Sequence, residues 1–194
     1  MLALAGKLGW FLMVTAWYVI RLPHERKAKR ELISHTGRNA GETLRMLIAG
    51  TGLGIMPLLF FWTGFPAAFS YQPSIVQLLA GAIAGFAALR IFWLTHQALG
   101  EFWSVSLDLK EKHRLVTQGI YQSLRHPMYA GFWLMALGQA LLLANWIAGF
   151  AGLFGFAFLF FTRIGPEETL MESQFGQEYR DYCHRTWRII PHVW

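Results

Sequence analysis

Four long apolar runs alternate with polar segments along this chain. They occupy positions 2–20, 46–62, 74–94 and 128–162. About 20 apolar residues, each rising 1.5 Å, cross a hydrocarbon core of about 30 Å, so each of the first three runs predicts a transmembrane helix. The last run is interrupted at Ala144-Asn145-Trp146, and each half is short for a full span, which predicts a tight helical hairpin. The pattern favours an all-α integral membrane protein with about five transmembrane helices, of which the last two form a short hairpin.

Basic residues gather on alternate connectors. The connector at 21–45 contains seven Lys and Arg residues, whereas the connector at 63–73 contains none. Basic residues return at 110–125 and again at 163–188. Because cytoplasmic loops carry an excess of Lys and Arg, this multi-pass protein is expected to have its N-terminus outside and its C-terminus in the cytoplasm. The arginines of the first cytoplasmic loop are expected to contact membrane lipids.

Composition agrees with a membrane location. Of the 194 residues, 55% are hydrophobic and only 14% are charged, so lipid must cover part of the surface. The basic loops explain the net charge of +6, and no nucleic-acid partner is expected. We expect a monomer with one membrane domain over 1–194.

Glycines at four-residue spacing indicate close helix packing. Gly50 with Gly54 and Gly81 with Gly85 are expected to let neighbouring helix backbones approach. Gly50, Gly52 and Gly54 also resemble a dinucleotide-binding loop, but no strand precedes them, so packing is the interpretation adopted here.

Polar residues suited to chemistry flank the predicted hairpin. Pro127 disfavours helix at His126 and suits the first turn of the helix that follows. His126, Met128 and Tyr129 then surround a helix N-terminus, whose unpaired backbone amides favour an anion.

Two adjacent carboxylates follow the hairpin. Gly165 and Pro166 are expected to end its second helix and to start another, which places Glu167 and Glu168 in a helical first turn. The two carboxylates are suited to bind a cation, an amine or ribose hydroxyls. Taken singly, these residues also fit ordinary helix ends, with Arg163 reaching the membrane surface and the glutamates complementing a helix dipole.

Three sequence blocks in the C-terminal half form a combined pattern. They are Leu115-Val116-Thr117-x-Gly119-x-Tyr121, then Arg125-His126-Pro127-x-Tyr129-x-Gly131, then Glu167-Glu168-x-Leu170 with Phe175-Gly176-x-Glu178-Tyr179-x-x-Tyr182. In this order they resemble the isoprenylcysteine carboxyl methyltransferase family, and are most similar to its prokaryotic members. The resemblance covers the chain from Gly100 onward, and the N-terminal helices contribute no motif. It therefore implies a cofactor-binding, catalytic region at 100–194 on a helical scaffold at 1–99. The similarity to prokaryotic members implies that the protein lies in a prokaryotic cell membrane.

The resemblance implies methyl transfer from S-adenosylmethionine, with S-adenosylhomocysteine as product. The acceptor would be the carboxylate of a prenylated cysteine or a related lipophilic molecule, methylated within the membrane. No Rossmann domain is implied, and the chain agrees, since it has no strand followed by a Gly-rich turn.

Site residues are implied position by position. The adenine side of the cofactor would be lined by His113, Leu115 and Val116. The amino-acid part would be wrapped by Tyr121, His126, Pro127, Met128 and Tyr129, with Glu167 completing the pocket. Arg163 matches the family arginine near the substrate carboxylate and is expected to orient the nucleophile. Ser106 stands where some family members have a larger polar residue that touches the cofactor.

The implied reaction needs alignment and desolvation rather than a general base, because a carboxylate is already a nucleophile and a sulfonium methyl group is already activated. A prenyl chain must enter from the bilayer, so a lipid-facing gap is expected near the cytoplasmic ends of the third helix and the hairpin. No metal site is expected, because the histidines lack ligand spacing and this chemistry needs no Lewis acid.

Three other functions stay open at the level of sequence. A phospholipid or small-amine methyltransferase would use the same cofactor surface but would depend on Glu168 rather than Arg163 for binding the amine. An NADPH-dependent sterol-type reductase would share a distantly similar C-terminal core. A non-catalytic membrane scaffold would bind neither cofactor.

Overall fold

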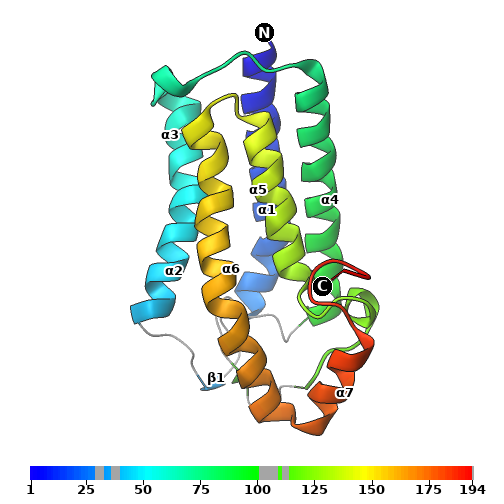
Figure 1. Cartoon of the computed structure of the whole chain (residues 1–194). Coiled ribbons are helices and arrows are strands. Elements are labelled where there is room, and N and C mark those ends of the chain that lie inside the picture. The colour runs from blue at the N-terminus through cyan, green and yellow to red at the C-terminus, as the bar shows by residue number, and fades with distance from the viewer. Residues whose placement is uncertain (29–32, 36–39, 101–108, 111–113, 194) are drawn as a thin grey trace.

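The computed structural model of this chain is a bundle of helices (Figure 1). It describes residues 1–28, 33–35, 40–100, 109–110 and 114–193. In chain order the elements are α1 (Leu2–Ala28), β1 (Ile33–His35), α2 (Ala40–Gly50), the π-helical turn η1 (Thr51–Ile55), α3 (Met56–Thr63), the 3-10 turn η2 (Ala67–Phe69), α4 (Ile75–Leu99), β2 (Leu109–Lys110), the 3-10 turn η4 (Gly119–Gln122), α5 (Pro127–Leu142), α6 (Trp146–Phe175) and α7 (Gln177–Arg185). The two short strands pair antiparallel with each other. Within the described residues the predicted helical class is confirmed.

Four helical segments are long and apolar enough to cross a membrane, within the part of the chain that the structure describes. They are Leu2–Arg26, Ala40–Thr63, Ile75–Leu99 and Trp146–Phe175. The protein is therefore a multi-pass integral membrane protein. Helix α5 has 16 residues and is shorter than a typical span of about 20. Five full spans stay a prediction.

The predicted hairpin is formed by α5 and α6, and its turn is fixed by Asn145. The Asn145 side-chain oxygen accepts hydrogen bonds from the backbone N–H groups of Ile147 and Ala148, at 3.1 and 2.9 Å, and so caps α6. Its amide nitrogen donates to the Pro66 carbonyl at 2.8 Å. One buried side chain thus starts α6 and ties the hairpin to the connector between α3 and α4.

The second half of the hairpin is longer than predicted, and the expected helix break at Gly165-Pro166 is wrong. Helix α6 runs for 30 residues, with Pro166 inside it. A proline in a helix removes one backbone hydrogen bond, at a cost of about 3 kcal/mol. Ion pairs to Arg163, Glu167 and Glu168, described below, hold the turns on both sides of Pro166 and offset this loss.

A buried glutamine joins the hairpin to the second span. The turn η1 lies immediately before α3, which has Pro57 in its first turn. Gln139 of α5 donates from Nε2 to the carbonyl oxygens of Gly52 and Ala148, both at 2.9 Å. Because polar side chains that bond across helices hold membrane bundles together, Gln139 fixes the second span against the hairpin.

The predicted glycine packing is confirmed for one pair and wrong for the other. A Cβ at Gly81 would lie 2.9 Å from Leu142 Cγ, and a Cβ at Gly85 would lie 2.8 Å from Met13 Sδ. A Cβ at Gly50 or Gly54 would meet nothing within 4 Å. Four-residue spacing defines a helix face but not the neighbour of that face.

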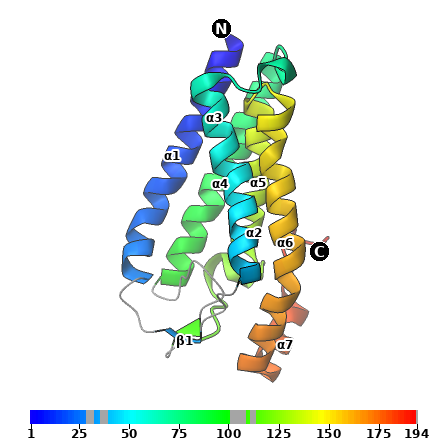
Figure 2. The ribbon, with the colours of Figure 1, turned by 90° about the vertical axis from the view of Figure 1, so that its left-hand side faces the viewer.

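Gly52 takes the packing role on the second span. A Cβ on Gly52 would lie 2.2 Å from the Ala151 carbonyl oxygen of α6. On α6 itself, a Cβ on Gly155 would lie 2.8 Å from the Ile48 carbonyl oxygen. Bare backbone on both helices therefore lets α2 and η1 lie directly against α6, as the two views in Figures 1 and 2 show.

We predict that Gly52→Ala destabilises the protein by about 1–3 kcal/mol, because overpacking against backbone cannot be relieved by moving a side chain. Gly50→Ala is the matched control, two residues away, where the new methyl group has open space. Thermal unfolding in detergent should show a lower midpoint for Gly52→Ala alone. Equal midpoints for the two variants would contradict the packing described here.

Candidate active site

Helix ends from both halves of the chain meet at one end of the bundle (Figures 1 and 2). The end of α1, the starts of α2 and α5, and the C-terminal part of α6 lie there, with α7 beyond them. As predicted, Pro127 occupies the first turn of α5, and His126 before it has non-helical backbone angles.

Glu167 on α6 is bound by three side chains. The Tyr129 hydroxyl donates a hydrogen bond to Glu167 Oε2. His126 Nδ1 lies 3.6 Å from Glu167 Oε1, and Arg163 Nε lies 3.7 Å from Oε2. The rings of His126 and Tyr129 are stacked with centroids 5.6 Å apart. The helix start at Pro127 and one turn of α6 thus form a single polar cluster.

Glu168, the next residue, faces different partners. Arg188 donates to both of its carboxylate oxygens, at 3.0 and 2.7 Å. His126 Nε2 lies 3.2 Å from Glu168 Oε1, and Arg125 Nε lies 3.5 Å from the same atom. Glu168 therefore joins the C-terminal segment to the start of α5.

His126 lies between two carboxylates and is 7% exposed. Burial by itself lowers the pKa of this imidazole, but the hydrogen bonds and negative charges of Glu167 and Glu168 outweigh burial and raise the pKa. Each ring nitrogen has a carboxylate as its neighbour, so the doubly protonated form of the imidazole is favoured.

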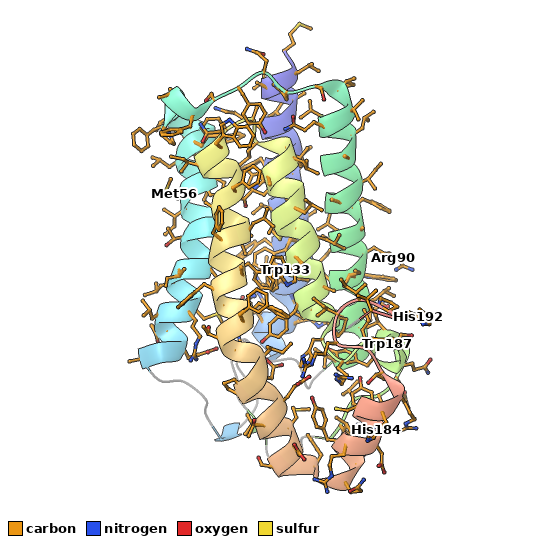
Figure 3. All side chains as sticks on the ribbon, in the orientation of Figure 1. Met56, Arg90, Trp133, His184, Trp187 and His192 are labelled. Carbon is orange, nitrogen blue, oxygen red and sulfur yellow. The ribbon has the colours of Figure 1, made fainter. Side chains whose placement is uncertain are left out.

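The C-terminal segment pairs with the backbone of this loop. The N–H of Arg125 donates to the Trp187 carbonyl at 2.7 Å, and the N–H of His126 donates to the Arg188 carbonyl at 2.9 Å. In return, the N–H of Trp187 donates to the Ser123 carbonyl at 2.9 Å. Figure 3 shows Trp187 and His192 in this segment, where their rings lie 5.2 Å apart. Residues after α7 therefore hold the loop that carries His126.

Arg163 of α6 is 8% exposed and lies between carboxylates from two helices. Its Nη1 atom lies 3.2 Å from Oε1 of Glu42, in the first turn of α2. Its Nε atom faces Glu167 of α6 itself. The sequence patterns gave no role to Glu42, which the fold brings to the site.

A mostly apolar cavity of about 630 Å³ adjoins this polar cluster. Its volume is typical of pockets for small molecules and cofactors, which span about 300–1,000 Å³. The predicted site residues that line it are Leu115, Val116, Tyr121, His126, Met128, Tyr129, Arg163 and Glu167. Pro127 is buried at the start of α5 and is not part of the wall. His113 and Ser106 lie outside the described residues.

The apolar part of the cavity runs between α1 and the second span. Trp17 and Tyr18 of α1 line one side, and Leu53 and Gly54 of η1 line the other. In the described residues α1 packs on α4 and α5 and does not pack along α2 (Figure 2). Leu99 at the end of α4 and Met128 at the start of α5 line the same cavity, and the lipid-facing gap expected near the cytoplasmic ends of the third helix and the hairpin stays a prediction.

Among the described residues no three His, Cys, Asp or Glu side chains are grouped as a metal site would require. The absence of a metal stays a prediction, as do the roles of the individual site residues.

Comparison with known proteins gives a consistent family. Residues 78–173 match the model of the isoprenylcysteine carboxyl methyltransferase family. Protein-S-isoprenylcysteine O-methyltransferase B of Arabidopsis thaliana is 35% identical over 89 residues, which are 46% of this chain and 45% of that protein. The Schizosaccharomyces pombe protein-S-isoprenylcysteine O-methyltransferase is 41% identical over 87 residues, 45% of this chain and 37% of that protein.

The matched regions are partial. This chain spans a little less than half the length of the Arabidopsis relative. The solved structure of a eukaryotic intramembrane Ras methyltransferase aligns with 81% of this chain and 55% of that chain, at 22% identity and a TM-score of 0.46. The relatives named here are eukaryotic, so they give no support to the expected prokaryotic affinity.

We predict that the stability of the protein falls as the pH rises from 6 to 9, because of His126. A histidine whose pKa is raised by folding contributes stability that is fully present below its unfolded pKa of about 6.5 and is lost as the pH rises through the folded pKa. Thermal unfolding of the wild type and of His126→Asn in detergent measures this contribution.

The wild type should lose more stability over this range than His126→Asn. The control is His184→Asn, an exposed histidine of α7 that is labelled in Figure 3 and lies outside the cluster. Equal pH slopes for the wild type and His126→Asn would refute the assignment.

Proposed function

We propose that this chain, whose residues 78–173 match the model of the isoprenylcysteine carboxyl methyltransferase family, methylates the carboxylate of a prenylated cysteine or a related lipophilic acceptor. The methyl donor is S-adenosylmethionine, and the reaction takes place within the membrane. The observation that carries this proposal is the cavity, which joins an apolar part between α1 and the second span to a buried arginine.

The shape of the cavity supports a lipid acceptor. A prenyl chain is too apolar to approach through water and enters from the bilayer, between α1 and the second span. Trp17 and Leu53 line that route, and Arg163 lies in the same cavity wall. An acceptor that reaches in from lipid would therefore bring its polar end to Arg163.

The polar end of the cavity fits the donor. An amino-acid group carries an ammonium and a carboxylate, and this wall offers the Glu167 carboxylate together with the guanidinium of Arg125 and the imidazole of His126. Leu115 and Val116 provide apolar wall beside them for an adenine ring. When bound, S-adenosylmethionine supplies an activated methyl group on a positively charged sulfur.

Arg163 is proposed to orient the acceptor. The carboxylate oxygen forms the new bond to the methyl carbon while the bond from that carbon to sulfur breaks, and no proton moves. Arg163 fixes the direction of the carboxylate, and the apolar walls exclude water that would otherwise solvate it. Tyr129 and His126 hold Glu167 in place at the donor end.

The same proposal includes the topology and the division of the chain. The end of the bundle that carries the site is rich in arginine, while the connector between α3 and α4 contains no Lys or Arg. We place the site end in the cytoplasm and the N-terminus outside, with α5 as a fifth crossing. Residues 100–194 supply the donor site, on the scaffold of residues 1–99.

The phospholipid or amine methyltransferase is disfavoured by the partners of Glu168. That carboxylate is bound by Arg188, Arg125 and His126, so an amine would compete with three cationic groups. Assays with a prenylcysteine and an amino-phospholipid side by side separate the two functions. Titration of S-adenosylmethionine and NADPH against the purified protein tests the reductase and the non-catalytic scaffold.

We predict that Arg163→Ala retains donor binding but loses methyl transfer about 100-fold, because a misaligned carboxylate rarely meets the methyl group. Donor affinity by calorimetry and turnover with a prenylcysteine are measured separately. Arg163→Lys keeps a cation in case the alanine variant fails to fold, and it should lose turnover as well. Normal turnover in a folded variant would refute the role of Arg163 in orienting the acceptor.

We predict that Gly54→Leu raises the KM for a prenylated acceptor about tenfold or more and leaves donor affinity unchanged. Gly54 lines the apolar part of the cavity, and a side chain there has open space to fill. Gly54→Ala is the matched control and should change KM little. An unchanged KM in Gly54→Leu would show that the acceptor takes another route.

A further inference from the structure

Glu42 is a buried acid that lies apart from the sequence motifs. It is 3% exposed, in the first turn of α2, and outside the segment matched by the family model. Glutamate is almost never fully buried unless it is paired. Its partners include Arg163 Nη1 at 3.2 Å and Arg45 Nη1 at 3.4 Å. Its position therefore depends on a contact between α2 and α6.

The packing of α2 on α6 holds this pair in register. Gly155 lies two turns before Arg163, and a Cβ there would touch the backbone of Ile48 and Ala49. Helices α2 and α6 lie side by side (Figures 1 and 2). This packing brings Glu42 of α2 beside Arg163 of α6. The Arg163 side chain on α6 is thus fixed by a contact from α2, which restricts its rotamers.

Glu42 lies behind Arg163 as seen from the cavity. Arg163 is part of the cavity wall, whereas Glu42 is not. The guanidinium of Arg163 is therefore paired with Glu42 and with Glu167, and Arg163 also lines the cavity. An acceptor carboxylate that binds Arg163 therefore meets a guanidinium whose positive charge is already partly balanced by Glu42 and Glu167.

That sharing matters for the chemistry of methyl transfer. The acceptor carboxylate and the donor sulfur lose their charges as an ester and a neutral thioether form. An arginine with a full, unshared charge would stabilise the carboxylate more in the ground state than in the transition state, which raises the barrier. A second carboxylate behind the arginine keeps its direction but weakens this ground-state effect.

We propose that Glu42 is a positioning residue that holds Arg163 at the cavity wall and shares its charge, so that the acceptor carboxylate is oriented without being over-stabilised. The inference rests on the proposed function and names a residue in the N-terminal half as part of its machinery.

The test is the kinetics of Glu42→Gln, which keeps the size of the side chain and removes its charge. The KM for a prenylcysteine acceptor should fall several-fold and kcat should fall about tenfold, with donor affinity unchanged. Glu42→Asp keeps the charge and should restore kcat toward the wild-type value. A merely structural role would lower the melting temperature and leave both kinetic constants as they are, and that result overturns the proposal.

Two controls keep the outcome decisive. Glu172→Gln removes a carboxylate from an exposed pair with Arg180, at 2.9 Å on the surface, and should behave as the wild type does. In the Arg163→Lys background, Glu42→Gln should change kcat much less than it does alone, and multiplicative effects of the two substitutions would contradict action through Arg163. If Glu42→Gln does not fold, the comparison of Glu42→Asp in the two backgrounds decides in the same way.

The failure of this inference is distinguishable from the failure of the proposed function. If the wild type methylates neither a prenylcysteine nor a related lipophilic carboxylate, the proposed function fails. If the wild type is active and Glu42→Gln has wild-type kinetics, only the role of Glu42 is refuted.

Discussion

The burial of Arg163 is the constraint on which the rest of the site depends. A guanidinium removed from water costs several kcal/mol unless carboxylates and hydrogen bonds compensate for it. Glu167 is one turn away on the same helix, but Glu42 comes from another helix. That helix must therefore approach α6 closely, which the bare backbones of Gly52 and Gly155 allow. The glycine packing deep in the bundle therefore allows the charge pairing at its end, because Glu42 reaches Arg163 only when α2 lies close to α6.

The continuity of α6 through Pro166 gives its two adjacent glutamates different tasks. Successive residues on a helix point about 100° apart, so Glu167 lines the cavity while Glu168 faces the C-terminal segment. Both contact the ring of His126. A break at Pro166 would free the following turn from the rest of α6 and loosen this arrangement. Because α6 is a single helix, it joins the cavity wall at Glu167 rigidly to the C-terminal segment that Glu168 contacts.

Local chemistry made part of this structure predictable from sequence. The apolar runs, the hairpin turn at Asn145 and the helix start at Pro127 follow from residues that act on their immediate neighbours. The choice of Gly52 over Gly50, the apolar part of the cavity between α1 and the second span, and the continuity of α6 depend on which faces pack together, and composition in a membrane does not specify this. Glu42 did have a signal, since it is the only acidic residue from 40 to 100 and a buried arginine needs a partner. The individual roles of the residues around the cavity stay predictions.

The two ends of the cavity draw on different parts of the chain. The polar end uses residues of the family-matched segment, such as His126 and Glu167, together with the C-terminal segment that clamps them. The apolar wall combines residues that lie before that segment, such as Trp17 of α1 and Leu53 of η1, with residues inside it, such as Met128 and Phe156. In the proposed function, residues before the matched segment therefore contribute to the space for the acceptor. Under the proposed function, a change at Trp17 or Leu53 would alter the space for the acceptor and leave the charged groups around Glu167 in place, so acceptor preference could vary while the reaction stays the same.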